Sequence, residues 1–378
     1  MCYTLIMAGI LSRFFNKNTE SVLGIDIGTS AIKVVQLKKK DGQAVLETYG
    51  ELALGPYAGV EIGQATNLPV EKIIEALNDL MREKEVNLST NKCGIAIPFS
   101  SSLMSLIEMP MLSYKQLSVM IPLEARKYIP VPISEVTLDW SIIPKDENED
   151  VTEDKEDDKG PTKIKKTDIL LVAIHNETIS RYQEIVNKTG LEASFYEIEI
   201  FSTMRSVIED EREPVMVLDM GAASTKLYIV ERGIVRVSHT INRGSQDITT
   251  TISKSLGVSV SDAEIMKRTQ GANVRGEVNL KEIVHLSLEY VFAEANQVIL
   301  NYQRRYKKTL SKVVMVGGGS ALKGLSEMAQ LSFQSEVVAG NPFVKTEAPA
   351  FLENVLKDTG PEFAVAVGVA LRRLQEES

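Results

Sequence analysis

An apolar, strand-like run that ends in Asp-x-Gly occurs twice in this chain. The first run, residues 22–28, carries Asp26, and the second, residues 215–221, carries Asp219 roughly 190 residues later. In both copies another strand-like run follows the glycine-containing turn. Self-similarity at so long a period indicates two related halves that enclose a cleft. The chain is therefore expected to contain two lobes of similar construction.

The chemistry of these two turns suits a nucleotide. Each strand delivers a carboxylate at its C-terminal end, and the turn after it exposes backbone N–H groups that can hold phosphate oxygens. Asp26 and Asp219 are the candidate catalytic residues, and together they could hold Mg²⁺ through water, as that cation prefers. Contacts with the phosphates are predicted for Gly28, Thr29, Ser30, Lys33, Gly221, Ser224 and Thr225. The alternative is that each Asp-x-Gly only closes a hairpin.

A third motif lies at residues 313–321, where a buried-type strand leads into three glycines. Gly317, Gly318 and Gly319 would let the backbone approach a base or a phosphate closely. Ser320 follows them, and a helix is expected next, with its N-terminus facing the ligand. The sequence has no G-x-x-x-x-G-K-[ST] match, so the motif is not a Walker A loop. A plain glycine-rich connector is the alternative.

Elsewhere strands alternate with helices, which favours an α/β architecture. Residues 69–85 and 178–189 are predicted helices, and residues 93–97 form a predicted strand. No window approaches the ~18 apolar residues of a spanning helix, which excludes an integral membrane protein. The two cysteines cannot form a disulfide framework, and the net charge of −9 argues against an electrostatic nucleic-acid binder. A cytoplasmic location is expected.

Residues 99–175 have only short apolar runs and are interpreted as an inserted subdomain. A helix is predicted at 114–128, and strands are predicted at 136–143 and 168–174. Between residues 146 and 158, nine acidic residues accompany one lysine, so this stretch carries −8 of the net charge of −9. It has no apolar run to anchor it, which predicts a disordered acidic loop at 145–166. An acidic docking segment is the alternative.

The predicted organisation has six parts. They are an N-terminal arm (1–20), the first lobe (21–98), the inserted subdomain (99–175), the rest of the first lobe (176–213), the second lobe (214–360) and a C-terminal helix that returns to the first lobe (361–378).

In this order, the three motifs resemble the phosphate 1, phosphate 2 and adenosine motifs of the superfamily of actin, heat-shock chaperones and sugar kinases. The resemblance covers nearly the whole chain and implies an actin-like two-domain fold that binds ATP and Mg²⁺. It also implies that the segment with Gly244 and Asp247 contacts the nucleotide, and that Glu264 and Lys267 reach the ribose and base. The small-residue run at 363–370 resembles a connecting helix at the hinge; a helix core is the alternative.

More specific segments, at residues 124–130, 138–140 and 340–343, are similar to the cell-division protein FtsA and, more closely, to the type IV pilus assembly protein PilM family. The resemblance implies an inserted subdomain of the SHS2 type and a protein that captures the cytoplasmic tail of an inner-membrane pilus protein, PilN. The implied contact residues are Glu124, Tyr128, Ile129 and Pro130. Tyr128 and Ile129 could instead belong to the core of the subdomain.

The resulting function is ATP binding in type IV pilus assembly, with nucleotide controlling domain closure and hydrolysis slow or absent. The expected partner is a PilN-like tail. Self-association is a further expectation, nucleic acid is excluded as a partner, and any membrane contact is expected to be indirect or weak. Two alternatives stay open: an FtsA-like division scaffold, and a small-molecule kinase of the same superfamily, although no substrate loop with an acidic base is recognisable.

Overall fold

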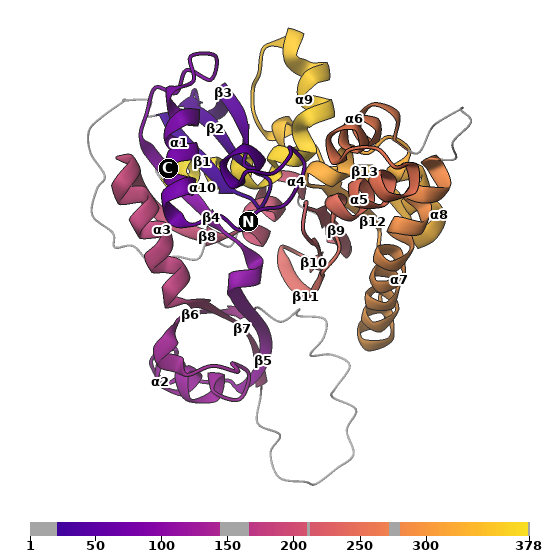
Figure 1. The fold of residues 1–378 in the computed structure, drawn as a ribbon. Coiled ribbons are helices and arrows are strands. Elements are labelled where there is room, and N and C mark those ends of the chain that lie inside the picture. Colours follow the sequence, from indigo (N-terminus) through magenta and orange to yellow (C-terminus); the bar gives the residue numbers. More distant parts are fainter. Residues whose placement is uncertain (1–20, 144–165, 210–211, 272–279, 377–378) are drawn as a thin grey trace. The chain divides into compact units, whose positions relative to one another are not determined.

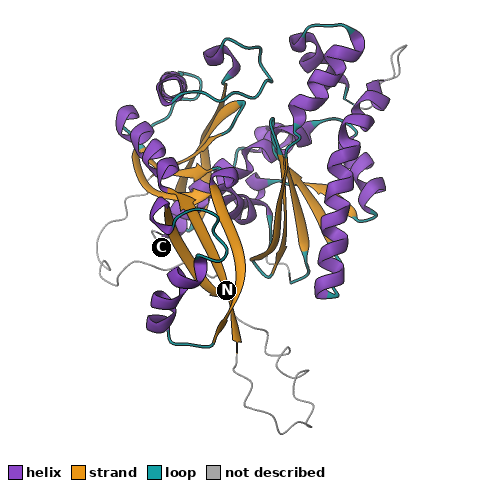
Figure 2. Ribbon diagram, turned by 60° about the horizontal axis from the view of Figure 1, so that its bottom comes forward, coloured by secondary structure: helices purple, strands orange, loops and turns teal. Residues whose placement is uncertain are grey.

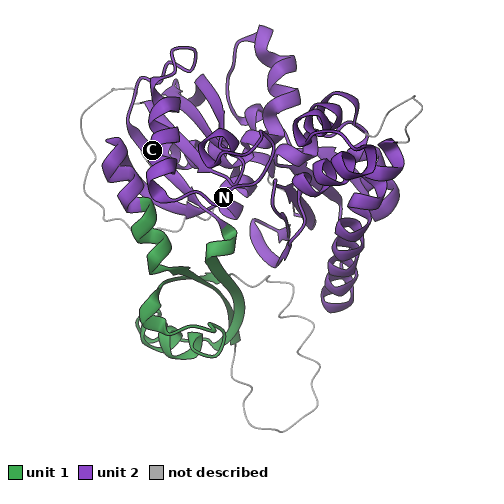
Figure 3. Cartoon of the chain, in the orientation of Figure 1, with its two compact units in different colours: residues 1–11, 99–182 green, residues 12–98, 183–378 purple. Residues whose placement is uncertain are grey.

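The structure is a computed structural model that describes residues 21–143, 166–209, 212–271 and 280–376. Its described residues divide into two compact units (Figure 3): a smaller unit, from Phe99 to Tyr182, and a larger unit, from Ser21 to Pro98 and from Gln183 onward. The predicted N-terminal arm and the acidic loop, up to residue 165, lie outside the described residues. In the part that is described, no helix is both long enough and apolar enough to cross a membrane.

Each lobe of the larger unit is built on a five-stranded mixed sheet (Figure 2). The first sheet has the order β3-β2-β1-β4-β8, and the second has the order β11-β10-β9-β12-β13. The strands of the first sheet are β1 (Ser21–Ile27), β2 (Ala31–Lys40), β3 (Gln43–Ala53), β4 (Lys92–Ile97) and β8 (Glu192–Ile198). Those of the second are β9 (Val215–Met220), β10 (Thr225–Glu231), β11 (Ile234–Ile241), β12 (Lys312–Val316) and β13 (Glu336–Ala339).

The two sheets repeat one another in topology and in register. In both, a central strand pairs antiparallel with the strand that follows it and parallel with a strand on its other side. Asp26 lies opposite Lys33 in the first hairpin, and Asp219 lies opposite Lys226 in the second. Counterparts are 193 positions apart, from 26 to 219 and from 33 to 226. The repeat predicted from the sequence is thus a repeat of structure.

The helices cover the sheets because each has an apolar face. In α1 the buried residues Ile73, Leu77 and Leu80 recur at helical spacing. The helix α10 packs on β1 and on α4, while α5 to α8 enclose the core of the second lobe (Figure 1). The helices of the larger unit are α1 (Val70–Arg82), α4 (Glu199–Val207), α5 (Ser245–Leu256), α6 (Val260–Gln270), α7 (Leu280–Tyr306), α8 (Leu325–Phe333), α9 (Glu353–Thr359) and α10 (Ala364–Glu376).

The smaller unit is a three-stranded antiparallel sheet with the order β5-β7-β6, covered by one helix. Its elements are β5 (Ser102–Pro110), α2 (Tyr114–Ala125), β6 (Val136–Ile143) and β7 (Lys166–His175), and α3 (Asn176–Thr189) begins within it. The sheet and helix share a core that includes Leu117, Ile121, Ile169 and Leu171. The unit therefore has a hydrophobic core of its own.

The bounds of two predicted helices differ in the structure. The predicted helix at 114–128 ends at Ala125, because the N–H groups of Lys127 and Tyr128 bond to carbonyls three residues back, which tightens the last turn. The helix expected directly after Ser320 begins later, at Leu325. A short 3₁₀ turn, η4 (Gly318–Ala321), and the left-handed residue Gly324 (φ 82°) intervene.

Candidate functional site

The two glycine turns have the same hydrogen bond. The N–H of Gly28 donates to the carbonyl oxygen of Ala31 at 3.0 Å, and the N–H of Gly221 donates to that of Ser224 at 3.0 Å. Each turn follows a strand whose penultimate residue is an aspartate. Both lobes thus present a carboxylate and an adjoining turn of backbone in the same local arrangement.

A lysine accompanies each of these carboxylates. Lys226 Nζ lies 2.8 Å from Glu199 Oε2 and 3.7 Å from Asp219 Oδ2, and Lys33 Nζ lies 3.5 Å from Glu51 Oε1. Lys33 was predicted from the sequence, whereas Lys226 and Glu199 were not. The 193-residue offset would have identified Lys226 as the counterpart of Lys33. No sequence pattern identifies Glu199, because it reaches the cluster only when α4 packs there in the folded chain.

The electrostatics of the cluster follow from its burial. Burial raises the pKa of Asp26 to about 6, against the opposing effect of Lys33, and the nearby charge of Asp219 adds to the rise. Burial also raises the pKa of Asp219, although Lys226 opposes it. Burial would lower the pKa of Lys226, but Glu199 and Asp219 outweigh it and raise that pKa. The charges of Lys226 and Asp219, both from the second lobe, therefore act on Asp26 in the first lobe.

The third motif packs directly against the second aspartate. Gly317 has a φ of 84°, and an added Cβ there would overlap the carboxylate of Asp219. An added Cβ at Gly319 would overlap the side chain of Met220. The hydroxyl of Ser320 donates back to the carbonyl of Gly317 at 2.7 Å, which closes the turn. Glycine is required here because the backbone lies against the loop that carries Asp219.

Glu362, which the sequence did not single out, also belongs to this region. It lies in η7 (Gly360–Phe363), and its Oε2 would be 3.6 Å from a Cβ at Gly318. Its charge contributes to the raised pKa of Lys33, after Glu51 and Asp26, all of which act against burial. Glu362 thus links the triple-glycine turn to the first lobe.

The residues expected to reach the ribose and base form a buried ion-pair group. Lys267 Nζ lies 2.6 Å from Glu264 Oε2, and the hydroxyl of Thr249 donates to the same oxygen at 2.7 Å. Arg268 Nε donates to Glu264 Oε1 at 2.8 Å. Gly63 of the first lobe, at φ 93°, would place a Cβ 2.7 Å from Glu264 Cδ. Glu264 and Lys267 therefore lie together where the first lobe meets the second.

Gly244 and Asp247 form the N-terminal cap of α5. Asp247 Oδ2 accepts the N–H of Gly244 at 2.9 Å, and its Oδ1 accepts Arg243 Nη1 at 2.9 Å. The hydroxyl of Thr225 is buried and donates to the carbonyl of Arg243 at 2.8 Å. The Thr225 hydroxyl therefore anchors the backbone before α5. It is not exposed, so in this structure it is not available to a phosphate.

Thr29 and Ser30, two further predicted hydroxyl residues, lie in the first glycine turn. Thr29 is exposed, and its carbonyl accepts the N–H of Thr66 at 2.8 Å. Ser30 is half-buried, and its carbonyl accepts the N–H of Leu54 at 2.8 Å. These bonds fix the first turn from the backbone side and leave the Thr29 side chain in solvent.

The carboxylates suit a cation held through water. Nowhere in residues 21–143, 166–209, 212–271 and 280–376 do three His, Cys, Asp or Glu side chains form a metal centre. Asp26 and Asp219 could supply hard oxygen ligands from the two lobes, because Mg²⁺ keeps several of its waters when it binds beside phosphates. The glycine turns, with no side chain in the way, fit the phosphates of a nucleotide.

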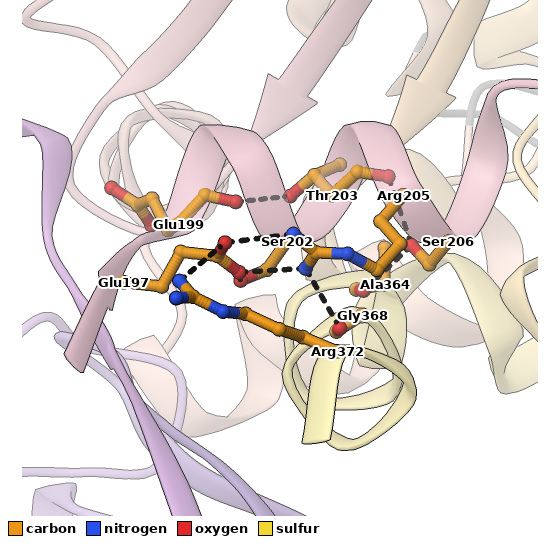
Figure 4. A network of polar contacts seen from close by, with 9 residues as sticks. All are labelled: Glu197, Glu199, Ser202, Thr203, Arg205, Ser206, Ala364, Gly368 and Arg372. Atoms are coloured by element: carbon orange, nitrogen blue, oxygen red, sulfur yellow. Dashed lines mark hydrogen bonds and ion pairs between the residues drawn. The ribbon is translucent and has the colours of Figure 1, made fainter. Parts of the chain in front are cut away.

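A buried network ties α4 to α10 beside this site (Figure 4). Glu197 accepts Arg205 Nη1 and Nη2 at 2.7 Å each and Arg372 Nη1 at 2.9 Å. An added Cβ at Gly368 would overlap the carbonyl oxygen of Ser202. The small residues of 363–370 thus let α10 pack closely on α4, which is compatible both with a connecting helix and with a helix core.

The four predicted partner residues lie in the smaller unit and differ in exposure. Tyr128 is 44% exposed, and Pro130 is exposed. Glu124 pairs with Lys127 at 2.7 Å. Ile129 is only 6% exposed and belongs to the core of the unit, so its side chain is not available for a partner. The alternative that this segment belongs to the core therefore holds for Ile129 and not for Tyr128, which lies at the surface.

Comparison with known proteins adds family and fold. The sequence model of the type IV pilus assembly protein PilM matches residues 24–374. The cell division protein FtsA of Neisseria meningitidis is 23% identical, over 91% of this chain and 88% of that protein.

Solved structures agree on the fold. The PilM-PilN type IV pilus biogenesis complex has a TM-score of 0.75 at 22% identity, over 93% of this chain and 98% of that chain. The structure of MreB5 of Spiroplasma citri bound to AMPPNP has a TM-score of 0.50 at 11% identity, over 95% and 98%. These likenesses confirm the predicted actin-like fold.

Proposed function

Because the chain belongs to the PilM family of type IV pilus assembly proteins, we propose that it binds Mg-ATP between its two lobes and captures the cytoplasmic tail of a PilN-like inner-membrane protein. Nucleotide controls closure of the lobes in this proposal, and hydrolysis is slow or absent. The protein works in the cytoplasm and is held at the inner membrane through its partner.

The observation that carries the nucleotide part is the pair of matched turns. Asp26 lies opposite Lys33 in one hairpin and Asp219 lies opposite Lys226 in the other. The charge of Asp219 is among those that raise the pKa of Asp26, after burial and Glu199. Two carboxylates that repel in this way gain from a shared cation. Lys33 and Lys226 beside them are suited to the negative phosphates.

Several residues of this chain would hold the ligand. Asp26 and Asp219 would hold Mg²⁺ through water, and the turns at Gly28, Gly221 and Gly317 would face the phosphates. The ion-pair group of Glu264 and Lys267, with Gly244 and Asp247, would line the nucleoside side. When bound, Mg-ATP would contact both lobes at once. A ligand that binds the closed arrangement better than the open one favours closure.

Slow turnover is proposed because Asp26 and Asp219, the two candidate bases, would be occupied by Mg²⁺ when the nucleotide is bound. A carboxylate that holds the cation is a poor proton acceptor for an attacking water. ATP is then mainly a conformational ligand and only secondarily a substrate.

The partner part rests on the surface of the smaller unit. Tyr128 is exposed at the end of the α2 segment, and Leu123, 59% exposed, lies on the same segment. An exposed aromatic side chain with an apolar neighbour is the kind of anchor that dominates binding energy in protein interfaces. This surface is our candidate for the tail of a PilN-like protein.

Replacement of Tyr128 by alanine is expected to weaken binding of a PilN-like tail peptide about tenfold, because a half-exposed aromatic anchor contributes on the order of 1.4 kcal/mol or more. Calorimetric titration of the full chain with the peptide measures this. Tyr114→Ala is the matched control, since Tyr114 is a second exposed tyrosine of the same unit, at the opposite end of α2. Equal affinity for wild type and Tyr128→Ala would remove Tyr128 from the interface.

An FtsA-like scaffold is the second candidate, favoured by the identity with the Neisseria protein across most of both chains. That function would require binding to anionic vesicles by the protein alone in the presence of Mg-ATP. Co-sedimentation separates the candidates: strong pelleting without a partner peptide supports the scaffold, and its absence supports the tail-capture function.

A further inference from the structure

The long helix α7 has a second apolar face that the second lobe does not cover. One face buries Val284, Leu288 and Val291 in the core. On the other, Leu286 is 67% exposed and Tyr290 is 55% exposed. Figure 1 shows α7 at the edge of the larger unit. An aligned set of exposed apolar side chains on one helix marks an interaction surface more often than scattered ones do.

The exposed residues follow the spacing of a coiled-coil seam. Steps of four and three residues alternate along a stripe in which every member is exposed, namely Leu286, Tyr290, Ala293, Gln297, Leu300 and Arg304. This is the a/d spacing of a helix that packs against another, with large apolar side chains at Leu286, Tyr290 and Leu300. We call this stripe the α7 seam.

The exposed charges along α7 differ between its halves. Glu282 and Glu289 lie in the N-terminal half together with Lys281, and Arg304 and Arg305 lie in the C-terminal half. A second copy aligned in parallel would bring Arg304 against Arg304. A second copy aligned antiparallel would bring Arg304 beside Glu289, about 4.5 Å apart along the axis at 1.5 Å per residue. Charge complementarity therefore selects the antiparallel arrangement.

We propose that the α7 seam docks antiparallel on the α7 seam of a second copy of this chain, about a two-fold axis at the level of residue 295. In that register Tyr290 packs on Leu300 of the second copy, and Ala293 faces Gln297. The interface is isologous, so every contact occurs twice. The inference does not depend on nucleotide or tail binding.

One helix seam buries less than the roughly 1,600 Å² of a standard stable interface. The dimer is therefore weak and depends on protein concentration. Sedimentation velocity of the full chain, from low to several hundred micromolar, should show a monomer–dimer equilibrium. Tyr290→Glu is expected to weaken association at least tenfold. Wild type that stays monomeric throughout the range overturns the proposal.

A matched control distinguishes association through the α7 seam from non-specific association of exposed apolar residues. Leu331 is 83% exposed on α8 of the same lobe, outside the seam. Leu331→Glu should leave the dimer constant unchanged. If Leu331→Glu and Tyr290→Glu weaken association equally, the dimer does not form through α7. Both positions are exposed, so neither change removes a core contact.

Disulfide trapping tests orientation and register. The background is Cys2→Ser, because the remaining Cys93 is fully buried and burial raises its thiol pKa to about 12. Under mild oxidation, a mixture of Tyr290→Cys and Leu300→Cys proteins should form a disulfide-linked dimer. Each variant alone should not, since positions 290 and 290 would be about 15 Å apart along the axis. A homodimer of Tyr290→Cys alone would contradict the antiparallel arrangement.

Discussion

Replacement of Glu197 by alanine is expected to lower the free energy of unfolding by about 3 to 5 kcal/mol. The carboxylate is buried and receives hydrogen bonds from Arg205 at 2.7 Å, from Arg372 at 2.9 Å and from Ser202 at 2.6 Å (Figure 4). Its removal leaves two guanidinium groups without their shared counter-charge in a poorly solvated place. Urea unfolding of the variant and of wild type measures the difference.

The control lies on the same strand. Glu192 is exposed at the start of β8, and Glu192→Ala should change stability by no more than about 0.5 kcal/mol. Glu197→Gln separates charge from volume, because it keeps the shape of the side chain and removes only its charge. A loss below about 1 kcal/mol in Glu197→Ala would show that the network does not hold α4 to α10.

The effect of Glu197 should depend on pH. Burial alone would raise the pKa of this carboxyl, but Arg205 and Arg372 outweigh it and hold the pKa below its ordinary value of 4.5. A group whose folded pKa is depressed contributes stability above its unfolded pKa and loses it as the pH falls through the folded value. The gap between wild type and Glu197→Gln should thus be full at pH 7 and shrink below pH 4.5.

Replacement of Asp26 or Asp219 by asparagine is expected to weaken Mg-ATP binding at least tenfold, which is about 1.4 kcal/mol. Each change keeps the side-chain shape and removes half of the anionic pair that would hold the cation through water. Calorimetric titration measures the affinity. Asp262→Asn is the charge-matched control, because Asp262 is an exposed acid at the start of α6 in the second lobe. Unchanged affinity in both site variants would exclude the two turns as the Mg-ATP site.

Misfolding would not account for the loss in Asp26→Asn. Because burial raises the pKa of Asp26 to about 6, the ionised form weakens the apo fold at neutral pH, so the variant should be at least as stable as wild type at pH 7.5. The same pKa makes Mg-ATP affinity of wild type fall as the pH drops through about 6.

The repeat made much of the fold predictable. The motif around Asp26 and Gly28 and its copy around Asp219 fixed two central strands with their hairpins, because a fully buried strand reads as a continuous apolar run. The half-exposed strands β3 and β5 were missed, since their burial does not alternate regularly and leaves little period-2 signal.

The charged side chains around the two aspartates were predictable only where the two lobes repeat. Lys226 is encoded by its offset from Lys33, but Glu199 and Glu362 reach the cluster through helices and turns remote in sequence. Tertiary packing also determines which of two adjacent residues is buried: Ile129 lies in a core and Tyr128 lies at the surface. No local pattern distinguishes two adjacent apolar residues that follow the end of a helix.

We propose that closure of the lobes by nucleotide also changes the affinity for the partner tail. This is tested most directly by titrating a PilN-like tail peptide into the full chain with and without Mg-ATP. A ligand can shift the lobes only through its different affinities for their arrangements, and the coupling is reciprocal. We expect the peptide affinity of wild type to change about fivefold or more with Mg-ATP, and that of Asp219→Asn to stay constant. Equal peptide affinity in wild type with and without bound nucleotide would contradict the account.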